Sequence, residues 1–184
     1  MTVITKQHIL ITGANGFIGR NLCVFLKGKG NFVRGAVRNN ARGVSGVDEY
    51  IQVGDINEST DWQEALDGVD AVIHLAARVH IMNDSAGNPA TEGEMPEEVS
   101  EPIWARLEAF RKVNVLGTER LARMAAKAGV KRFIFISSVK VNGEGKTEPY
   151  REDDSPDPQD AYGISKREEG IRETVMTMSI SYNV

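Results

Sequence analysis

The sequence has a single cysteine and no segment of the kind that crosses a membrane. With only Cys23, the chain can form neither an internal disulfide nor a site built from several cysteines, and it suits a reducing compartment. No apolar run approaches the length that a bilayer requires, and MTVITKQHILIT at the N-terminus lacks the features of a secretory signal. The three histidines, His8, His74 and His80, do not have the spacing of metal ligands. We therefore expect a cytoplasmic protein without a bound metal.

Clustered positive charge and aromatic residues are also scarce. The net charge is −4, aromatic residues make up 7% of the chain, and the lysines and arginines do not gather into a basic segment. Binding to nucleic acid or to an anionic membrane needs such a cluster, so we expect small molecules as partners instead. Hydrophobic residues at 41% and charged residues at 26% are typical of a soluble globular domain with a substantial core.

Short apolar runs alternate with helical patterns along the chain. Helical patterns cover residues 17–30, 59–68 and 101–129, and each ends on a glycine. Several apolar runs are nearly continuous in Val, Ile, Leu and Phe, as in strands buried on both faces of a parallel sheet. The alternation predicts a Rossmann-type, doubly wound α/β sheet in three α/β/α layers, with a ligand crevice at the carboxyl ends of its strands. The expected strands are HILIT (8–12), FVRGAV (32–37), YIQV (50–53), DAVIHLAA (70–77) and RFIFIS (132–137).

One segment breaks this order. Residues 83–101 are rich in Gly, Pro, Ser and acidic residues, which predicts a mobile surface loop. The loop could be a lid over the crevice or a solvated insertion, and the insertion is the simpler interpretation.

The glycine turn ILITGANGFIG is the first candidate site. Its three glycines follow the first predicted strand and open a helix, which is the context of the dinucleotide-binding fingerprint. Glycine lets the backbone approach a pyrophosphate closely, and the N–H groups at the start of the helix favour its negative charge. The alternative is a turn that only reverses the chain. We expect the diphosphate of NAD(P) to be bound by Gly13, Gly16, Phe17, Ile18 and Gly19.

The next two strand ends bear on the choice of cofactor. Arg38 stands at the end of the second strand, where an acidic residue would bond the ribose hydroxyls of NAD. A guanidinium there can clamp the 2′-phosphate of NADP, so NADP(H) is favoured over NAD(H), although Arg38 could also simply solvate the strand end. Asp55 and Ile56 follow the third strand and are candidates for contacts with the adenine.

Four motifs together resemble the extended short-chain dehydrogenase/reductase family: the glycine turn at 12–19, HLAA at 74–77, FISS at 135–138 and YGISK at 162–166. The chain is most similar to the nucleotide-sugar epimerases, dehydratases and 4-keto reductases of that family, and HLAARVHIMND and SSVKVNGE are similar to a bacterial branch that acts on UDP-N-acetylhexosamines. The resemblance implies reversible hydride transfer at sugar C4 between a UDP-sugar and NAD(P).

The same resemblance implies a reaction centre of Ser138, Tyr162 and Lys166. On a helix, a spacing of four residues puts the tyrosine and the lysine on one face, where the ammonium stabilises the phenolate. Tyr162 would exchange a proton with a sugar hydroxyl and Lys166 would hold the nicotinamide ribose. Ser138, rather than Ser137, would hydrogen-bond the reacting oxygen. The alternative for such a tyrosine and lysine is an ordinary surface pair.

Further positions carry weaker implications. Ala76 and Ala77 are small enough to let the cofactor lie against the backbone, and His74 is expected to pack or hydrogen-bond nearby. Asn114 matches an asparagine of the family that can brace strand ends or a water; a structural and a catalytic role are equally open, and we count it among the candidate cofactor-binding residues. Asn142 stands where the family more often has a tyrosine, which leaves the sugar contacts of this loop open.

Two other features have simpler interpretations. The carboxylates of REDDSP (151–156) suit a solvated loop better than an acid/base pair. Trp104, Leu107 and Phe110 have the spacing of one apolar helix face, which packs into the core or against another subunit. The resemblance implies a homodimer through helices at residues 104–128 and 161–176.

Extended members of the family have a further C-terminal portion that grips the nucleotide-sugar. The resemblance therefore implies that residues 1–184 are a single dinucleotide-binding domain, incomplete at its C-terminus, from which the substrate domain is absent. This leaves two hypotheses: an enzyme of the nucleotide-sugar class, or a catalytically silent dinucleotide-binding module. An NADPH-dependent carbonyl reductase of another substrate class also suits Arg38.

Overall fold

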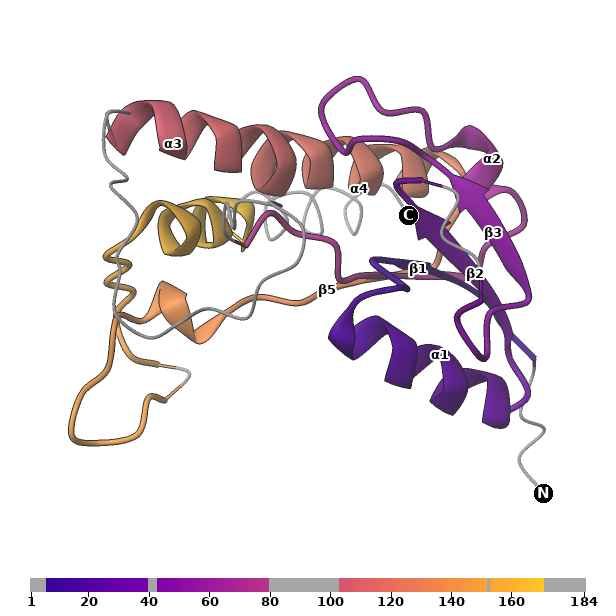
Figure 1. The fold of residues 1–184 in the computed structure, drawn as a ribbon, viewed down its shortest axis with the longest axis horizontal. Helices are drawn as coiled ribbons and strands as arrows, with labels where there is room; N and C mark the ends of the chain where they lie inside the picture. Colours follow the sequence, from indigo (N-terminus) through magenta and orange to yellow (C-terminus); the bar gives the residue numbers. More distant parts are fainter. Residues whose placement is uncertain (1–5, 40–42, 80–102, 152, 171–184) are drawn as a thin grey trace, which may run out of the picture.

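The described residues form a parallel sheet with helices on both faces (Figure 1). The structure is a computed structural model, which describes residues 6–39, 43–79, 103–151 and 153–170, with the backbone alone at 103–105. Residues 161–170 form a last helix. The other elements are β1 (His8–Thr12), α1 (Phe17–Gly28), β2 (Phe32–Val37), β3 (Glu49–Gln52), α2 (Gln63–Leu66), β4 (Ala71–His74), α3 (Ile103–Phe110), a π-helix (Arg111–Gly117), α4 (Thr118–Lys127), β5 (Arg132–Phe135) and a 3₁₀ turn (Val139–Val141).

The strand order confirms the doubly wound prediction. The sheet runs β3-β2-β1-β4-β5, and every neighbouring pair is parallel. The chain therefore moves outward from β1 in one direction and then restarts on its other side at β4. This reversal opens a crevice beyond the carboxyl ends of β1 and β4, where such sheets bind their ligands.

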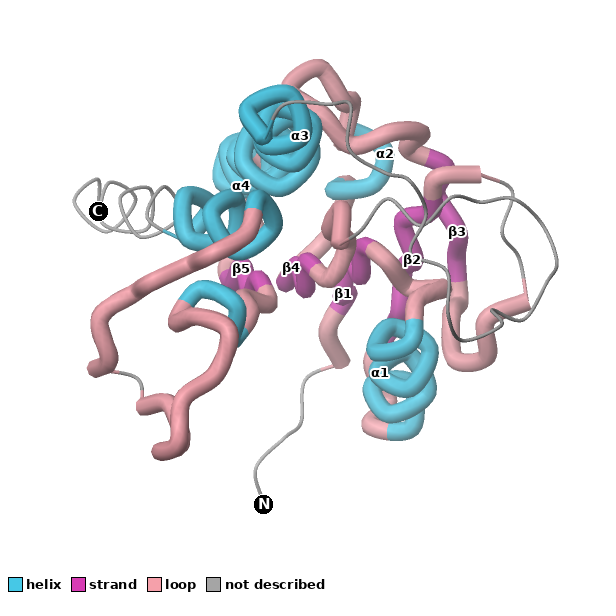
Figure 2. Tube along the Cα trace, turned by 60° about the vertical axis from the view of Figure 1, so that its left-hand side comes forward, coloured by secondary structure: helices cyan, strands magenta, loops and turns pink. Residues whose placement is uncertain are grey.

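Helix α1 lies on one face of the sheet and α2 and α4 lie on the other (Figure 2), and each face carries an apolar core. Helix α1 covers one face, where Ile9 and Ile11 of β1 pack with the buried Cys23. Helices α2 and α4 cover the other face, where Leu10 packs with Trp62 and other buried side chains. Alternate residues of β1 point to opposite faces of the sheet, and helices cover both faces. Both sides of this central strand are therefore buried, which explains its nearly continuous apolar sequence.

Two strands and one helix are shorter than their sequence patterns predict. The strand predicted to span 70–77 ends at His74, because the Thr12 side chain accepts hydrogen bonds from the amides of Leu75 and Ala76. The neighbouring strand β5 consequently ends at Phe135 rather than at residue 137.

The helix predicted over 59–68 is reduced to α2. The side chains of Asn57 and Thr60 form local bonds to the backbone instead, which compete with a helical start. Asp61 then accepts a hydrogen bond from the amide of Gln63, where the helix begins.

The long helix predicted over 101–129 is present from Ile103 to Lys127, but its middle is not α-helical. Residues Arg111–Gly117 form a π-helix, whose wider turns are rare and occur often at functional sites. Gly117 packs closely where this segment meets the loop after β3, since a Cβ there would lie 2.5 Å from the side chain of Ile56, which would have to move. Leu107 is half-buried and Phe110 is buried, in agreement with an apolar face.

Several predictions fall outside the described residues: the loop at 83–101, His80, the side chain of Trp104 and the part of the last helix beyond residue 170. Across the described ranges, no helix combines the length and the apolar character needed to cross a bilayer. The described part of REDDSP is a turn in which Asp154 pairs with Lys146, as expected for a solvated loop.

Candidate functional site

A cavity of about 990 Å³ lies at the reversal point of the sheet. It is lined by the residues that follow β1, β2, β3 and β4, together with parts of the π-helix and the residues after β5. Its volume is at the upper end of the range for ligand sites in proteins. The predicted site residues that line it are Gly13, Gly16, Phe17, Ile18, Gly19, Arg38, Asp55, Ile56, Ala76, Ala77 and Tyr162.

The glycine turn forms the part of the cavity wall between β1 and α1. The amide of Gly16 donates to the carbonyl of Gly13 at 2.9 Å, which closes a tight turn before the helix. Gly13 has a φ of 67°, and a Cβ on Gly19 would lie 2.2 Å from the carbonyl oxygen of Gly13. Glycine is therefore required at positions 13 and 19 for the turn to form. It leaves a backbone cradle at the start of α1, which is the environment that a diphosphate requires.

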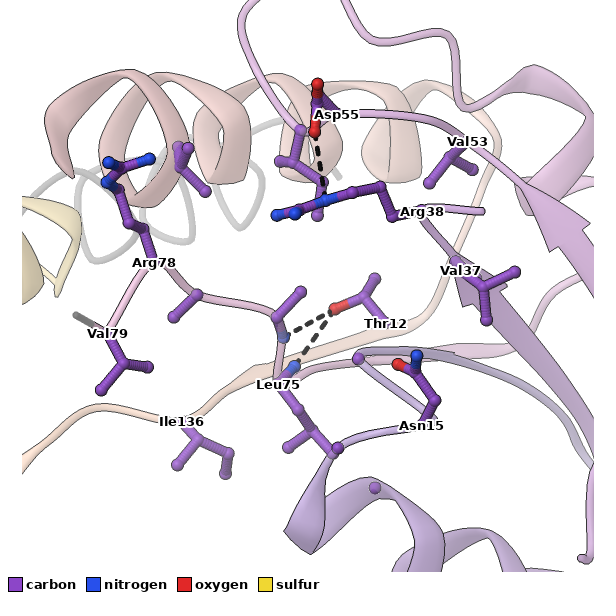
Figure 3. Close-up of a pocket in the computed structure, with 18 of the residues that line it drawn as sticks. Thr12, Asn15, Val37, Arg38, Val53, Asp55, Leu75, Arg78, Val79 and Ile136 are labelled. Carbon is purple, nitrogen blue, oxygen red and sulfur yellow. Dashed lines mark hydrogen bonds and ion pairs between the residues drawn. The ribbon is translucent and has the colours of Figure 1, made fainter. Parts of the chain in front are cut away.

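An ion pair joins two residues that line the cavity after β2 and β3 (Figure 3). Nε of Arg38 lies 3.1 Å from Oδ1 of Asp55, and both side chains are largely exposed. The two residues assigned to the adenosine part of the cofactor are therefore adjacent. A 2′-phosphate that binds Arg38 would also meet the carboxylate of Asp55, and like charge opposes that binding.

Buried hydrogen bonds hold the floor of the cavity. Oγ1 of Thr12 lies 2.7 Å from Nδ1 of His74, and Nε2 of His74 lies 2.9 Å from Oγ1 of Thr118. Burial, with a smaller contribution from the charge of Lys166, lowers the pKa of His74 to about 3. His74 is therefore a neutral structural link between β1 and α4, in agreement with the prediction that it packs or hydrogen-bonds.

Asn114 does not line the cavity but positions what does. From the middle of the π-helix, its side chain accepts from the amide of Arg78 at 2.8 Å and donates to the carbonyl of the same residue at 3.1 Å. It also donates to Oγ of Ser165 at 2.9 Å. Asn114 is buried, and it joins the segment after β4 to the helix that bears Tyr162. Asn114 thus links two segments of the chain, and its assignment to the cofactor site stays a prediction.

Tyr162 is on the helix at residues 161–170, and its position at the cavity depends on contacts with the long helix that contains Phe110 and Arg111. Its ring lies against Phe110 with centroids 6.3 Å apart. Further along, Arg111 makes two hydrogen bonds to the carboxylate of Glu168, at 2.6 and 2.8 Å. Tyr162 lines the same cavity as the residues of the glycine turn.

The other two members of the expected reaction centre do not line the cavity. Lys166 is buried, with its Nζ 2.5 Å from Oε2 of Glu169 and 5.4 Å from the centroid of the Phe135 ring. Ser138 accepts a hydrogen bond from the amide of Lys140 at 3.3 Å, and Ser137 lines the cavity in its place.

Two charged residues that line the cavity were not predicted from the sequence. Arg78 and Lys112 bring positive charge to the cavity, and the guanidinium of Arg78 lies 5.7 Å from the ring centroid of Phe110. Arg78 lies toward the end of the cavity formed by Val79 and Ile136 (Figure 3). Its place directly after HLAA was a usable signal, because residues that follow strand ends are the ones that meet the crevice.

Comparison with known proteins identifies the family. Residues 13–174 match a family model described as NAD(P)H-binding. The chain belongs to this NAD(P)H-binding family. The resemblance to the extended short-chain dehydrogenases/reductases is thereby confirmed, along with the Rossmann-type fold.

Individual relatives are much longer than this NAD(P)H-binding chain. A UDP-glucose 4-epimerase of Vibrio cholerae is 42% identical over 165 residues, which are 88% of this chain and 44% of the relative. Cinnamoyl-CoA reductase 1 of Petunia hybrida is 31% identical over 76% of this chain and 37% of its own length. The chain thus spans less than half the length of these curated relatives.

Solved structures agree with the fold. MoeE5 in complex with UDP-glucose and NAD superposes with a TM-score of 0.69 at 29% identity, covering 91% of this chain and 48% of that one. A short-chain dehydrogenase/reductase superfamily protein from Agrobacterium tumefaciens with bound NAD gives a TM-score of 0.67 at 30% identity, covering 91% and 44%.

Proposed function

We propose that this chain is the dinucleotide-binding part of a nucleotide-sugar 4-epimerase or 4-ketoreductase. The observation that carries the proposal is the place of Tyr162 in the wall of the cavity that the glycine turn opens. A phenol beside a dinucleotide site is suited to move a proton while a hydride moves to or from the cofactor. The UDP-glucose 4-epimerase relative and the UDP-glucose complex of MoeE5 support a UDP-sugar as substrate.

Separate groups of residues would bind the diphosphate and transfer the proton. The backbone at Gly13, Gly16 and Gly19 would hold the diphosphate, because the tight turn that these glycines form leads into the N-terminus of α1, where backbone N–H groups favour negative charge. Bound NAD(P) supplies or accepts the hydride. Tyr162 in its phenolate form would take the proton of the C4 hydroxyl as that carbon is oxidised, and the phenol would return it on reduction.

Lys166 and the serines would complete the reaction centre. Lys166 would hold the nicotinamide ribose, and Ser138, or Ser137 from the cavity wall, would donate to the reacting oxygen. Two further predictions accompany this assignment: a cytoplasmic location, and a homodimer through helices 104–128 and 161–176.

The test is a set of incubations with the purified chain. UDP-glucose, UDP-N-acetylglucosamine and its 4-keto-6-deoxy derivative are each supplied with NAD(H) or NADP(H), and the products are separated by chromatography. A C4 epimer, or a product reduced at C4, is the expected outcome. Saturable dinucleotide binding without any product would instead support a silent binding module. Oxidation of NADPH by an aryl or acyl carbonyl compound alone would support a reductase of the cinnamoyl-CoA kind, which Arg38 and the Petunia hybrida relative favour.

Arg38 makes the choice of cofactor testable. We expect NADPH to bind about fivefold more tightly than NADH, a modest difference because exposed ion pairs contribute little and Asp55 opposes the phosphate. Arg38→Ala should remove the difference, and Arg123→Ala, on α4 outside the cavity, should keep it. Calorimetric titration with both reduced dinucleotides provides the measurement. Equal affinities in the unmodified chain would refute the preference for NADP(H).

A further inference from the structure

Lys166 is withdrawn from the cavity that its neighbour Tyr162 lines. The two residues are one turn apart on the helix at 161–170, yet the ammonium group points into the protein. Only 3% of Lys166 and 1% of Glu169 are exposed, and Nζ and Oε2 lie 2.5 Å apart. A buried ammonium group is stable when a counter-charge meets it directly, and Glu169 provides one.

A chain of hydrogen bonds fixes the orientation of Glu169. It starts at the cavity floor, where Oγ1 of Thr12 accepts from two backbone amides at 3.1 and 3.2 Å. With both lone pairs used, the hydroxyl hydrogen of Thr12 must go to Nδ1 of His74. The neutral imidazole therefore carries its hydrogen on Nε2 and donates to Thr118, whose own hydroxyl donates to Oε1 of Glu169 at 3.2 Å.

Both carboxylate oxygens of Glu169 consequently face donors. Oε1 accepts from the hydroxyl of Thr118, and Oε2 forms the ion pair with the ammonium of Lys166. Both contacts favour the ionised form of the carboxyl group. Burial raises the pKa of Glu169, while Lys166 and Thr118 act in the opposite direction.

We propose that Glu169 is a positioning residue that docks the ammonium of Lys166 away from the cavity and competes with the dinucleotide for it. The inference rests on the proposed function, because it takes Lys166 as the residue that holds the nicotinamide ribose. Binding of the cofactor then requires Lys166 to leave Glu169, and the free energy of that separation is subtracted from the affinity. Thr118 and His74 set the strength of the dock by fixing the carboxylate.

The test is a double-mutant cycle on dinucleotide affinity. Glu169→Gln keeps the shape of the side chain but removes its charge, so the dissociation constants of NADH and NADPH should fall about fivefold. Lys166→Met should raise both constants. In the Lys166→Met background, Glu169→Gln should change neither dissociation constant, because the ammonium group that Glu169 holds is no longer present. An unchanged or weaker affinity in folded Glu169→Gln, or the same change in both backgrounds, would overturn the proposal.

Glu169→Asp and chemical labelling cover the case in which Glu169→Gln does not fold. The substituted side chain is one methylene shorter and keeps the negative charge, so the ion pair is loosened without leaving an unpaired ammonium, and the affinity should rise less. Without any dinucleotide, acylation by acetic anhydride followed by mass spectrometry should modify Lys166 far less than the exposed Lys127. Glu169→Asp should raise the labelling of Lys166 relative to Lys127.

The labelling separates the two possible failures. Equal labelling of Lys166 and Lys127 in the unmodified chain would overturn the dock, whatever the chain binds. Absence of dinucleotide binding together with protected Lys166 would instead overturn the proposed function and leave Glu169 as the partner of a lysine with no cofactor to hold.

Discussion

Replacing Tyr162 by phenylalanine should lower the turnover of a UDP-sugar by about 10²- to 10⁴-fold, the range typical for loss of a general acid or base. The ring packs against Phe110 through its faces and edges, and the variant keeps those contacts. Only the hydroxyl is lost, and with it the group that is proposed to exchange a proton with the sugar. Dinucleotide affinity should stay within about twofold of the original, because the glycine turn is unchanged. Product analysis and titration with NAD(H) and NADP(H) provide the two measurements.

Tyr50 offers a matched control. Its hydroxyl donates to the carbonyl of Val44 and accepts from the amide of the same residue, and Tyr50 is not among the residues that line the cavity. Tyr50→Phe removes the same atom at a structural site, so stability should fall while turnover is kept. Full turnover in Tyr162→Phe would exclude the phenol from the chemistry and return the cavity to a role in binding alone.

The buried histidine predicts how the stability of the fold depends on pH. An unfolded histidine titrates near pH 6.5, whereas burial lowers the pKa of His74 to about 3 in the folded chain. Between these values the unfolded state binds a proton that the folded state does not, so stability is present at neutral pH and is lost as the pH falls. From pH 7.5 to pH 5 the free energy of unfolding should decrease by about 2 kcal/mol through this group alone.

Urea denaturation at the two pH values, with and without His74, isolates the contribution. Glu169 acts in the opposite sense, since its raised pKa favours proton uptake by the folded state. The comparison must therefore be made against His74→Gln, which retains Glu169 and cannot take up a proton. The decrease should shrink by about 2 kcal/mol in that variant, even if its overall stability is lower. An unchanged pH dependence would show that His74 is protonated in the folded state, and the tautomer assigned to it would be wrong.

The elements that depend on short-range pattern could be predicted from the sequence. HILIT and the glycine turn were recognisable because an apolar run, a tight turn and a helix start follow one another without a gap, and FVRGAV was recognisable as a short apolar run. The doubly wound parallel sheet followed from the alternation of strands and helices, because crossovers between parallel strands have a strong preference of hand. The position of the cavity followed in turn, since residues at strand ends line it.

The features that depend on distant contacts could not be predicted. The strand at 70–77 ends early because Thr12, far away in the sequence, captures two amides that would otherwise continue the ladder. The π-helix is stabilised where Gly117 meets Ile56 and where Asn114 grips the segment after β4, and neither contact leaves a periodic signal. The spacing of Tyr162 and Lys166 placed both on one helix but could not show their different surroundings.

Contacts between the long helix that contains Asn114 and the helix at residues 161–170 fix the position of Tyr162. Phe110, Arg111, Asn114 and Thr118 occupy one side of a continuous helix, and each meets a residue of the tyrosine-bearing helix: Tyr162, Glu168, Ser165 and Glu169 respectively. All four contacts lie within the described residues. The position of Tyr162 relative to the glycine turn is accordingly fixed by these contacts alone, so under the proposed function no sugar would be needed to align the phenol with the dinucleotide.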